Sequence, residues 1–379
     1  MASLRFRHFS SARALKRFEP ACLIELLRPY RDYFKSRDWT WPEAGEEPDY
    51  QSLANVLMAP GSDTPDELLD ALFFIDEMST EEAMDGFLED PELRREVGER
   101  PTPADVALRA YLRDPDAFER KHAEANLRRP RSFESYLGPT NGNKATPFTE
   151  TLLQDLERSL DEWFVEHKRG RGCRVFHFSR NGASCFLVRH GAPYRREGRL
   201  EQGEPSSIYY RPERFDVVVY DVTYGELRMN AGTKGEKDLY REKFGLHLFG
   251  STDHFLDSQK FTLEPLRSAG RAALVCDDVE GLEEIKLKEV HYFWGGEHRE
   301  TEIRKADDVF AALEARNRTM PRAPLITAAK FRVKFSDART PRIVTVRVPN
   351  GAQYTRDSDG ELIDEWLAKR GFLRSATAS

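Results

Sequence analysis

The middle of the chain contains the pattern that most constrains the fold. Residues 174–189 read RVFHFSRNGASCFLVR, in which apolar and polar side chains alternate on both sides of Asn181-Gly182. An alternation with a period of two is typical of half-buried strands, and Asn-Gly is the strongest short signal for a two-residue hairpin turn. Such a turn pairs Arg180 with Ala183. We therefore predict an antiparallel hairpin whose register is set by the turn.

The chain before this hairpin carries signals for helix starts rather than strands. Each signal combines a capping side chain with a proline at the first helical position, or with an acid three residues after the cap. They occur at Thr64-Pro65, at Ser79 with Glu82, at Thr102-Pro103 and at Asp114-Pro115. They divide residues 10–127 into about six short helices, which predicts an N-terminal α-helical bundle.

A cluster of turn-forming residues, LGPTNGNKATP at 137–147, separates the two patterns. We place the domain boundary there, because such a segment has little to bury. The prediction is a helical domain at 1–138, a linker at 139–147 and a second domain at 148–379. One alternative divides the second domain again near residue 325.

The second domain begins with a helix, whose apolar residues keep a 3.6-residue period over 152–164. Strand patterns follow the hairpin and are broken by turn residues. We expect further strands at 206–212, 215–221, 226–231, 272–276, 331–335 and 342–348, and further helices at about 236–249 and 361–370. The predicted fold class is α+β, a helical bundle followed by a mainly antiparallel sheet with packed helices.

The overall composition is that of an ordinary soluble protein, with 39% hydrophobic and 32% charged residues. Its apolar runs are too short to cross a membrane, and its four cysteines show no regular spacing. We expect a cytoplasmic protein without a membrane partner, and the arginine-biased composition suggests a bacterial source. Residues 1–18 have five basic and no acidic side chains, as transit peptides do. We favour an amphipathic helix, because Leu15, Phe18 and Cys22 keep a helical spacing.

Charge is distributed unevenly along the chain. Residues 41–100 carry three Lys and Arg against 18 Asp and Glu, a local net charge of −15. A block of this sign repels nucleic acid. Its charges alternate with apolar positions at helical spacing, so we interpret it as the solvated face of several helices.

Residues 187–191, LVRHG, resemble the segment with which the histidine phosphatase family opens its active site. In that family the histidine attacks phosphorus, while two arginines, a second histidine and an acid surround the phosphoryl oxygens. No later segment supplies those partners here. In the predicted register Arg189 and His190 point to opposite faces of the sheet. Phosphoryl transfer through His190 is therefore not the expected function.

Two neighbouring predicted strands offer a different active site. Asp216 lies in one, and Glu226-Leu227-Arg228 in the next. This layout resembles restriction-type nucleases of the PD-(D/E)xK class, in which an Asp and a Glu hold Mg²⁺ and a lysine assists the reaction. The resemblance implies that Asp216 and Glu226 are metal ligands and that Arg228 takes the place of the lysine. An arginine departs from the pattern, because it does not lose its proton.

A basic segment at 168–214 carries eleven Lys and Arg against four Glu, with tyrosines interleaved. Arginines contact phosphates and aromatic rings stack on bases. An alternative is that these arginines dock on the protein's own acidic helices. We expect residues 191–207 to form a long polar loop. The candidate binding residues are Arg189, Tyr194, Arg195, Arg196, Arg199, Tyr209, Tyr210, Arg211 and Arg214.

Three functional hypotheses follow from these patterns. The leading one is a non-catalytic binding or regulatory protein that contacts nucleic acid or an acidic partner through the basic segment. It requires no cofactor. The second is an Mg²⁺-dependent nuclease centred on Asp216 and Glu226. The third is a scaffold subunit of a larger complex, with the helical domain as its docking surface.

Overall fold

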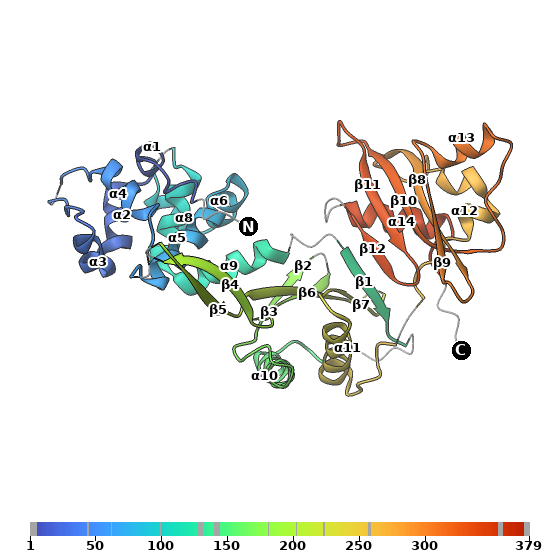
Figure 1. The fold of residues 1–379 in the computed structure, drawn as a ribbon, viewed down its shortest axis with the longest axis horizontal. Helices are drawn as coiled ribbons and strands as arrows, with labels where there is room; N and C mark the ends of the chain where they lie inside the picture. Colours follow the sequence, from blue (N-terminus) through green and yellow to red (C-terminus); the bar gives the residue numbers. More distant parts are fainter. Residues whose placement is uncertain are drawn as a thin grey trace. The chain divides into compact units, whose positions relative to one another are not determined.

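The computed structural model divides into two compact units, Met1–Ala125 and Asn126–Ser379. The units are described separately below (Figure 1). The structure describes residues 6–43, 45–61, 63–98, 100–127, 132–139, 145–180, 182–201, 203–222, 224–256, 259–354 and 359–374.

The boundary lies earlier than the sequence indicates. Strand β1 (Ser132–Leu137) was expected in the helical domain, but it pairs with β7 (Glu226–Asn230) and with β12 (Gly351–Gln353). It therefore belongs to the sheet of the second unit. Residues 140–144 of the predicted linker lie outside the described residues.

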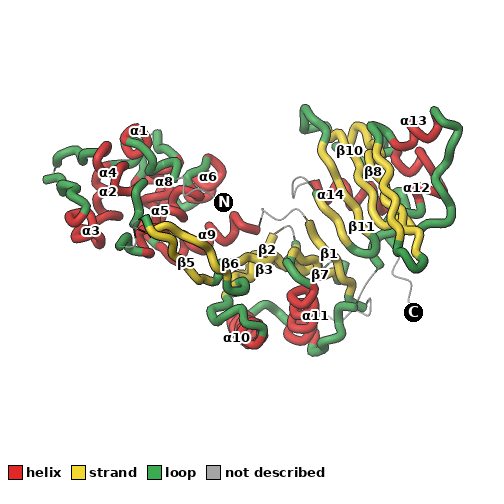
Figure 2. Tube along the Cα trace, in the orientation of Figure 1, coloured by secondary structure: helices red, strands yellow, loops and turns green. Residues whose placement is uncertain are grey.

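The first unit is helical, as predicted (Figure 2). Phe9, Leu15 and Phe18 are fully buried or nearly so in its core, so the segment with transit-peptide composition packs as part of the unit. The helices are α1 (Ala12–Leu15), α2 (Pro20–Leu27), α3 (Arg31–Ser36), α4 (Tyr50–Leu57), α5 (Asp66–Met78), α6 (Glu81–Phe87), α7 (Pro91–Glu96), α8 (Pro103–Arg113) and α9 (Pro115–Leu127).

Two of the four predicted helix starts are confirmed, those at Thr102 and Asp114. Thr102 caps α8 and Asp114 caps α9, and each accepts a hydrogen bond from a backbone N–H of the first turn.

The predicted cap at Thr64 is wrong, because α5 begins at Asp66 after Pro65 and the Thr64 hydroxyl accepts the N–H of Gly61 instead. The predicted cap at Ser79 is also wrong. Thr80 accepts the N–H of Ala83 instead, while the Ser79 hydroxyl donates to the last turn of α5.

The acidic block is largely exposed on these helices, as expected. Two of its members are only partly exposed, and both contact histidines. Asp76 accepts from the backbone N–H of His8, at 2.8 Å, and Glu77 Oε2 lies 2.9 Å from His122 Nε2.

The second unit is built on a ten-stranded antiparallel sheet with the order β2-β3-β6-β7-β1-β12-β11-β10-β8-β9. A separate two-stranded sheet pairs β4 with β5. The strands not yet introduced are β2 (Arg174–Arg180), β3 (Ala183–Gly191), β4 (Arg195–Glu201), β5 (Glu204–Tyr210), β6 (Glu213–Asp221), β8 (Leu282–Gly295), β9 (Glu300–Lys305), β10 (Leu325–Phe335) and β11 (Arg342–Arg347).

Two groups of helices cover the two halves of this sheet. Helices α10 (Glu150–Glu166) and α11 (Lys234–Phe249) pack on the half formed by β2, β3, β6, β7 and β1. Helices α12 (Pro265–Ser268), α13 (Val309–Glu314) and α14 (Asp359–Lys369) share a second core with β8, β10, β11 and β12. The observed fold class is the predicted one, α+β with helices at the N-terminus.

The hairpin has the predicted register. Strands β2 and β3 pair Arg180 with Ala183 and Phe176 with Leu187. The turn residue Asn181 lies outside the described residues. Alternate side chains of a strand point to opposite faces of the sheet. The register therefore decides which side chains of β2 and β3 face α10 and α11.

Two expectations about the second unit are wrong. Residues 272–276 are not a strand, because Gly270–Leu274 form a short 3-10 turn. Residues 191–207 are not a featureless loop, because they contain β4 and half of β5. None of the described helices is long and apolar enough to cross a membrane.

Candidate functional site

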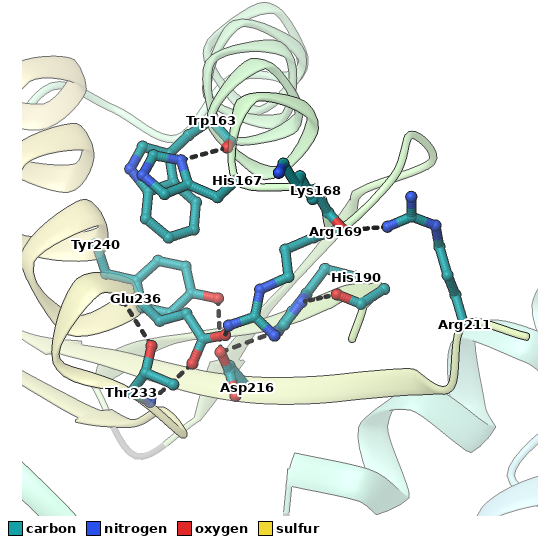
Figure 3. Close-up of polar contacts among 11 residues, drawn as sticks. Trp163, His167, Lys168, Arg169, His190, Arg211, Asp216, Thr233, Glu236 and Tyr240 are labelled. Atoms are coloured by element: carbon teal, nitrogen blue, oxygen red, sulfur yellow. Dashed lines mark hydrogen bonds and ion pairs between the residues drawn. The ribbon is translucent and has the colours of Figure 1, made fainter. Parts of the chain in front are cut away.

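One end of the sheet gathers polar side chains from four segments (Figure 3). His190 comes from the end of β3 and Asp216 from the beginning of β6. Glu236 and Tyr240 come from the first two turns of α11, and Arg169 follows α10. We call these five residues the polar cluster.

The cluster is held together by short contacts. Asp216 Oδ2 accepts a hydrogen bond from the Tyr240 hydroxyl at 2.8 Å and lies 3.1 Å from His190 Nε2. Arg169 Nη2 lies 3.2 Å from Glu236 Oε1. The register of β3 and β6 brings His190 and Asp216 together, because both side chains lie on the face of the sheet that α10 and α11 cover.

The start of α11 holds Glu236 in place. Thr233 caps the helix by accepting the N–H of Glu236, and the Glu236 carboxylate accepts the N–H of Thr233 at 2.8 Å. This reciprocal pair is a capping box. Tyr240 follows one helical turn later, so it projects from the same face of α11.

Apolar groups close the cluster off from solvent. The imidazole of His190 stacks on Phe164 with 4.2 Å between ring centroids, and the side chains of His190 and Asp216 are only 1% and 5% exposed. Burial, together with the negative charge of Asp216, raises the pKa of Tyr240 well above its usual value. Tyr240 therefore remains a phenol and a hydrogen-bond donor near neutral pH.

Exposed or half-exposed basic side chains lie on the segments around the cluster. Arg211 donates to the backbone carbonyl of Lys168, as Figure 3 shows. The guanidinium of Arg214 lies beside Gly232, just before α11, because a Cβ atom added to that glycine would lie 2.9 Å from Arg214 Nη1. We call this group the basic rim. Its members are Lys168, Arg171, Arg211, Arg214 and Lys234.

Strands β4 and β5 form a two-stranded ribbon that leaves β3 and returns to β6. A hydrogen bond of 2.7 Å between Ala192 N and Pro212 O closes its base. Cross-strand partners share a face. Arg196 pairs with Tyr209 on one face and Arg195 with Tyr210 on the other, so each face offers an arginine beside a tyrosine.

The structure brings together eight of the nine predicted binding residues. The ribbon carries Arg195, Arg196, Arg199, Tyr209 and Tyr210, and its base carries Tyr194, Arg211 and Arg214. The guanidinium of Arg211 lies 4.1 Å from the ring centroid of Tyr194.

Arg189 is the exception among the predicted binding residues. It lies in the main sheet, one position before His190, so it faces away from the polar cluster. Its Nε lies 3.5 Å from Glu213 Oε1.

Asp216 and Glu226, the predicted nuclease carboxylates, are not brought together. Glu226 pairs with Asp221, five positions along β6 from Asp216. An odd separation puts the two carboxylates on opposite faces of the sheet, and five residues span about 17 Å along a strand. They therefore cannot hold one shared Mg²⁺, because ligand distances to that ion are about 2.0–2.1 Å.

Glu226 and Arg228 belong to a separate polar network. Both carboxylate oxygens of Glu226 accept from Lys260 Nζ, at 2.9 and 3.1 Å. Arg228 Nη1 lies 3.9 Å from an oxygen of Asp364 on α14. Two acids face two bases here, so the network is compensated in charge.

The residues that complete the polar cluster were not predicted. Thr233 and Glu236 have capping-box spacing, which was a usable signal for the position of Glu236. Arg169 and Tyr240 carry no local signal, because only the packing of α10 and α11 on the sheet brings them to His190. Comparison with known proteins adds nothing to this picture, because no family model and no curated protein matches the chain.

Proposed function

We propose that the second unit is a non-catalytic nucleic-acid-binding module that uses the β4–β5 ribbon and the basic rim. The observation that carries the proposal is the ribbon itself. It forms a two-stranded sheet of its own, it places Arg beside Tyr on each face, and two tyrosines are about two-thirds exposed, Tyr194 at 64% and Tyr209 at 66%.

Exposed tyrosines distinguish a nucleic acid from an acidic protein as the partner. A two-stranded ribbon fits a nucleic-acid groove, and a tyrosine ring stacks on a base whatever its sequence. Acidic side chains have no flat ring to stack on. The apolar side chain of Leu200, 77% exposed near the tip of the ribbon, adds contact area that a purely electrostatic surface does not need.

The basic rim continues this surface beyond the ribbon. Arg211 joins the two parts, because it contacts Tyr194 at the ribbon base and the carbonyl of Lys168 after α10. Lys234 lies at the first position of α11, where the backbone N–H groups of a helix favour a phosphate. These groups support backbone contacts, which give affinity without sequence specificity.

The test is a binding titration with fluorescein-labelled single-stranded and duplex DNA over a range of salt concentrations. We expect binding that weakens with salt. In the triple variant R195A/R196A/R199A the slope of log K against log salt should fall by roughly 2–3, because each lost phosphate contact removes about 0.7–0.9.

The control is R94A/R95A/R100A, which removes the same charge from exposed positions in the first unit. It removes no proposed phosphate contact, so its slope of log K against log salt should fall much less than that of the ribbon variant. Three results would overturn the proposal: no binding at low salt, an unchanged slope in the ribbon variant, or competition by polyglutamate as strong as that by unlabelled DNA. The last result would favour an acidic protein partner.

A further inference from the structure

The polar cluster places a nitrogen of His190 against a carboxylate oxygen of Asp216. His190 Nδ1 lies 3.0 Å from the backbone carbonyl of Gly191. A carbonyl only accepts hydrogen bonds, so Nδ1 carries the proton. In the neutral imidazole Nε2 then presents a lone pair, and it faces Asp216 Oδ2 at 3.1 Å. The 3.1 Å between these two atoms is also the separation that two ligands of one metal ion have.

The charges of the cluster point the same way. Asp216 and Glu236 contribute two carboxylates, and Arg169 is the cation in contact with Glu236. Three residues of the cluster have side chains that can bind a metal ion, and all three are buried: His190 is 3% exposed, Asp216 4% and Glu236 2%. Buried carboxylates are stabilised by paired cations or by metal ions. A metal ion bound here would offset the charge of the two carboxylates.

From this arrangement we infer that His190, Asp216 and Glu236 form a binding site for one divalent transition-metal ion. A metal site needs at least three His, Cys, Asp or Glu side chains close together. Among the described residues these three form such a group, because one ligand atom from each lies within 4.8 Å of the other two. Ligand atoms bound at about 2.1 Å, with angles of about 90–109° between them, lie roughly 3.0–3.4 Å apart. The 3.1 Å separation of His190 Nε2 and Asp216 Oδ2 fits this range.

Each of the three ligands also has the outer partner that metal ligands usually have. The Gly191 carbonyl orients His190, the Tyr240 hydroxyl donates to Asp216, and the N–H of Thr233 donates to Glu236. The stacking of Phe164 fixes the plane of the imidazole. The three ligand residues come from β3, β6 and α11, so the site exists only in the folded unit.

The donor set selects the class of metal. One imidazole nitrogen with two carboxylates suits Mn²⁺, Fe²⁺, Co²⁺ or Zn²⁺, whereas Mg²⁺ and Ca²⁺ prefer oxygen ligands alone. The site is separate from the Asp216–Glu226 pair that the sequence suggested. It goes beyond the proposed DNA binding, which requires no metal.

The first experiment uses the untagged full-length chain after treatment with EDTA. Co²⁺ is added while the visible d–d absorption is recorded, and bound metal is counted by mass spectrometry after gel filtration. We expect one Co²⁺ per chain, a d–d spectrum, displacement by Zn²⁺ and a melting temperature that rises with Co²⁺ but not with Mg²⁺. Failure to bind Co²⁺ stoichiometrically would overturn the inference.

Variants then locate the ion. His190→Gln should weaken Co²⁺ binding by more than about tenfold, the effect of losing even an outer partner of a metal ligand. His167→Gln is the matched control, because His167 is an exposed histidine that stacks on Trp163 outside the ligand set. Binding that survives in His190→Gln, or is lost in His167→Gln, contradicts the assignment.

Circular dichroism of the metal-free variants establishes that each has folded. The Co²⁺ spectrum of the natural chain decides the question even if His190→Gln does not fold. Because the metal experiments contain no DNA, their outcome is independent of the DNA titration.

Discussion

Tyr209 is the residue that most directly tests the proposed binding of nucleic acid by the ribbon. It is 66% exposed and lies opposite Arg196. Stacking of a base on an aromatic ring contributes about 1–3 kcal/mol. We therefore expect Tyr209→Ala to weaken binding of single-stranded DNA by roughly 5- to 150-fold, with no change in thermal stability.

The control for this variant is Tyr224→Ala. Tyr224 is similarly exposed, at 73%, but lies in the turn between β6 and β7. Equal losses in the two variants, measured by fluorescence anisotropy at one salt concentration, would show that stacking on the ribbon does not contribute.

Glu289 on β8 gives a prediction about pH. Burial alone raises the pKa of its carboxyl, but hydrogen bonds from His291, Lys330 and Lys305 outweigh burial and lower that pKa to about 2, from an ordinary value of 4.5. A lowered pKa stabilises the folded state above about pH 4.5, and this stabilisation is lost as the pH falls toward 2.

Glu289→Gln should therefore lower the free energy of unfolding by about 1–3 kcal/mol near neutral pH. The difference from the natural chain should shrink as the solution is acidified. Urea denaturation at several pH values measures both effects. Glu284→Gln is the control, because Glu284 lies on the same strand but its side chain is half exposed and forms an ion pair with Lys286. A difference that does not depend on pH contradicts the explanation.

At the scale of single elements, the start of α11 connects stability to the polar cluster. Thr233 is both the N-cap of this helix and the partner of Glu236. Loss of a threonine cap costs about 0.5–2 kcal/mol, so Thr233→Ala should lower the free energy of unfolding by that amount. Thr233→Ser keeps the hydroxyl and should retain most of the stability. Urea denaturation of both variants is the measurement, and equal stability of Thr233→Ala and the natural chain would contradict it.

The elements that the sequence predicted are those with strong local signals. The Asn-Gly turn determined the register of β2 and β3, and proline caps located α8 and α9. The apolar run at 272–276 was assigned to a strand, but a run of five apolar residues fits any buried segment. Strand β4 of the ribbon was missed because charged residues and glycine dominate it, whereas most of β5 lies within the strand predicted at 206–212. In an exposed ribbon neither face is buried, so the alternation that reveals a half-buried strand is absent.

The candidate site was harder to predict, for a physical reason. His190 and Asp216 are close because β3 and β6 are neighbours in the sheet. In the sequence these two strands are separated by β4 and β5, so no local pattern shows that they pair. Glu236 reaches them only because α11 packs back on the sheet. Contacts between residues 20–46 positions apart carry no local pattern. The sequence suggested Asp216 as a metal ligand, but with Glu226 as its partner rather than His190 and Glu236.

At the scale of the whole molecule, the two units differ in charge. The first unit carries 16 Lys and Arg against 27 Asp and Glu, a net charge of −11, and the second carries 42 against 38, a net charge of +4. A net negative charge disfavours the approach of nucleic acid. If the second unit binds nucleic acid as proposed, we expect the charge of the first unit to weaken that binding, through electrostatics that salt screens.

This contrast predicts the behaviour of the separated units. Residues 126–379 contain the sheet, the ribbon and both helix-covered cores of the second unit, so we expect the fragment to fold and to bind DNA. At low salt it should bind roughly 2- to 10-fold more tightly than the full chain, and the difference should disappear as salt shortens the range of the repulsion to about 10 Å or less. Parallel anisotropy titrations of the full chain, of residues 126–379 and of residues 1–125 measure this. DNA binding by residues 1–125 alone would contradict the assignment of the interface to the ribbon.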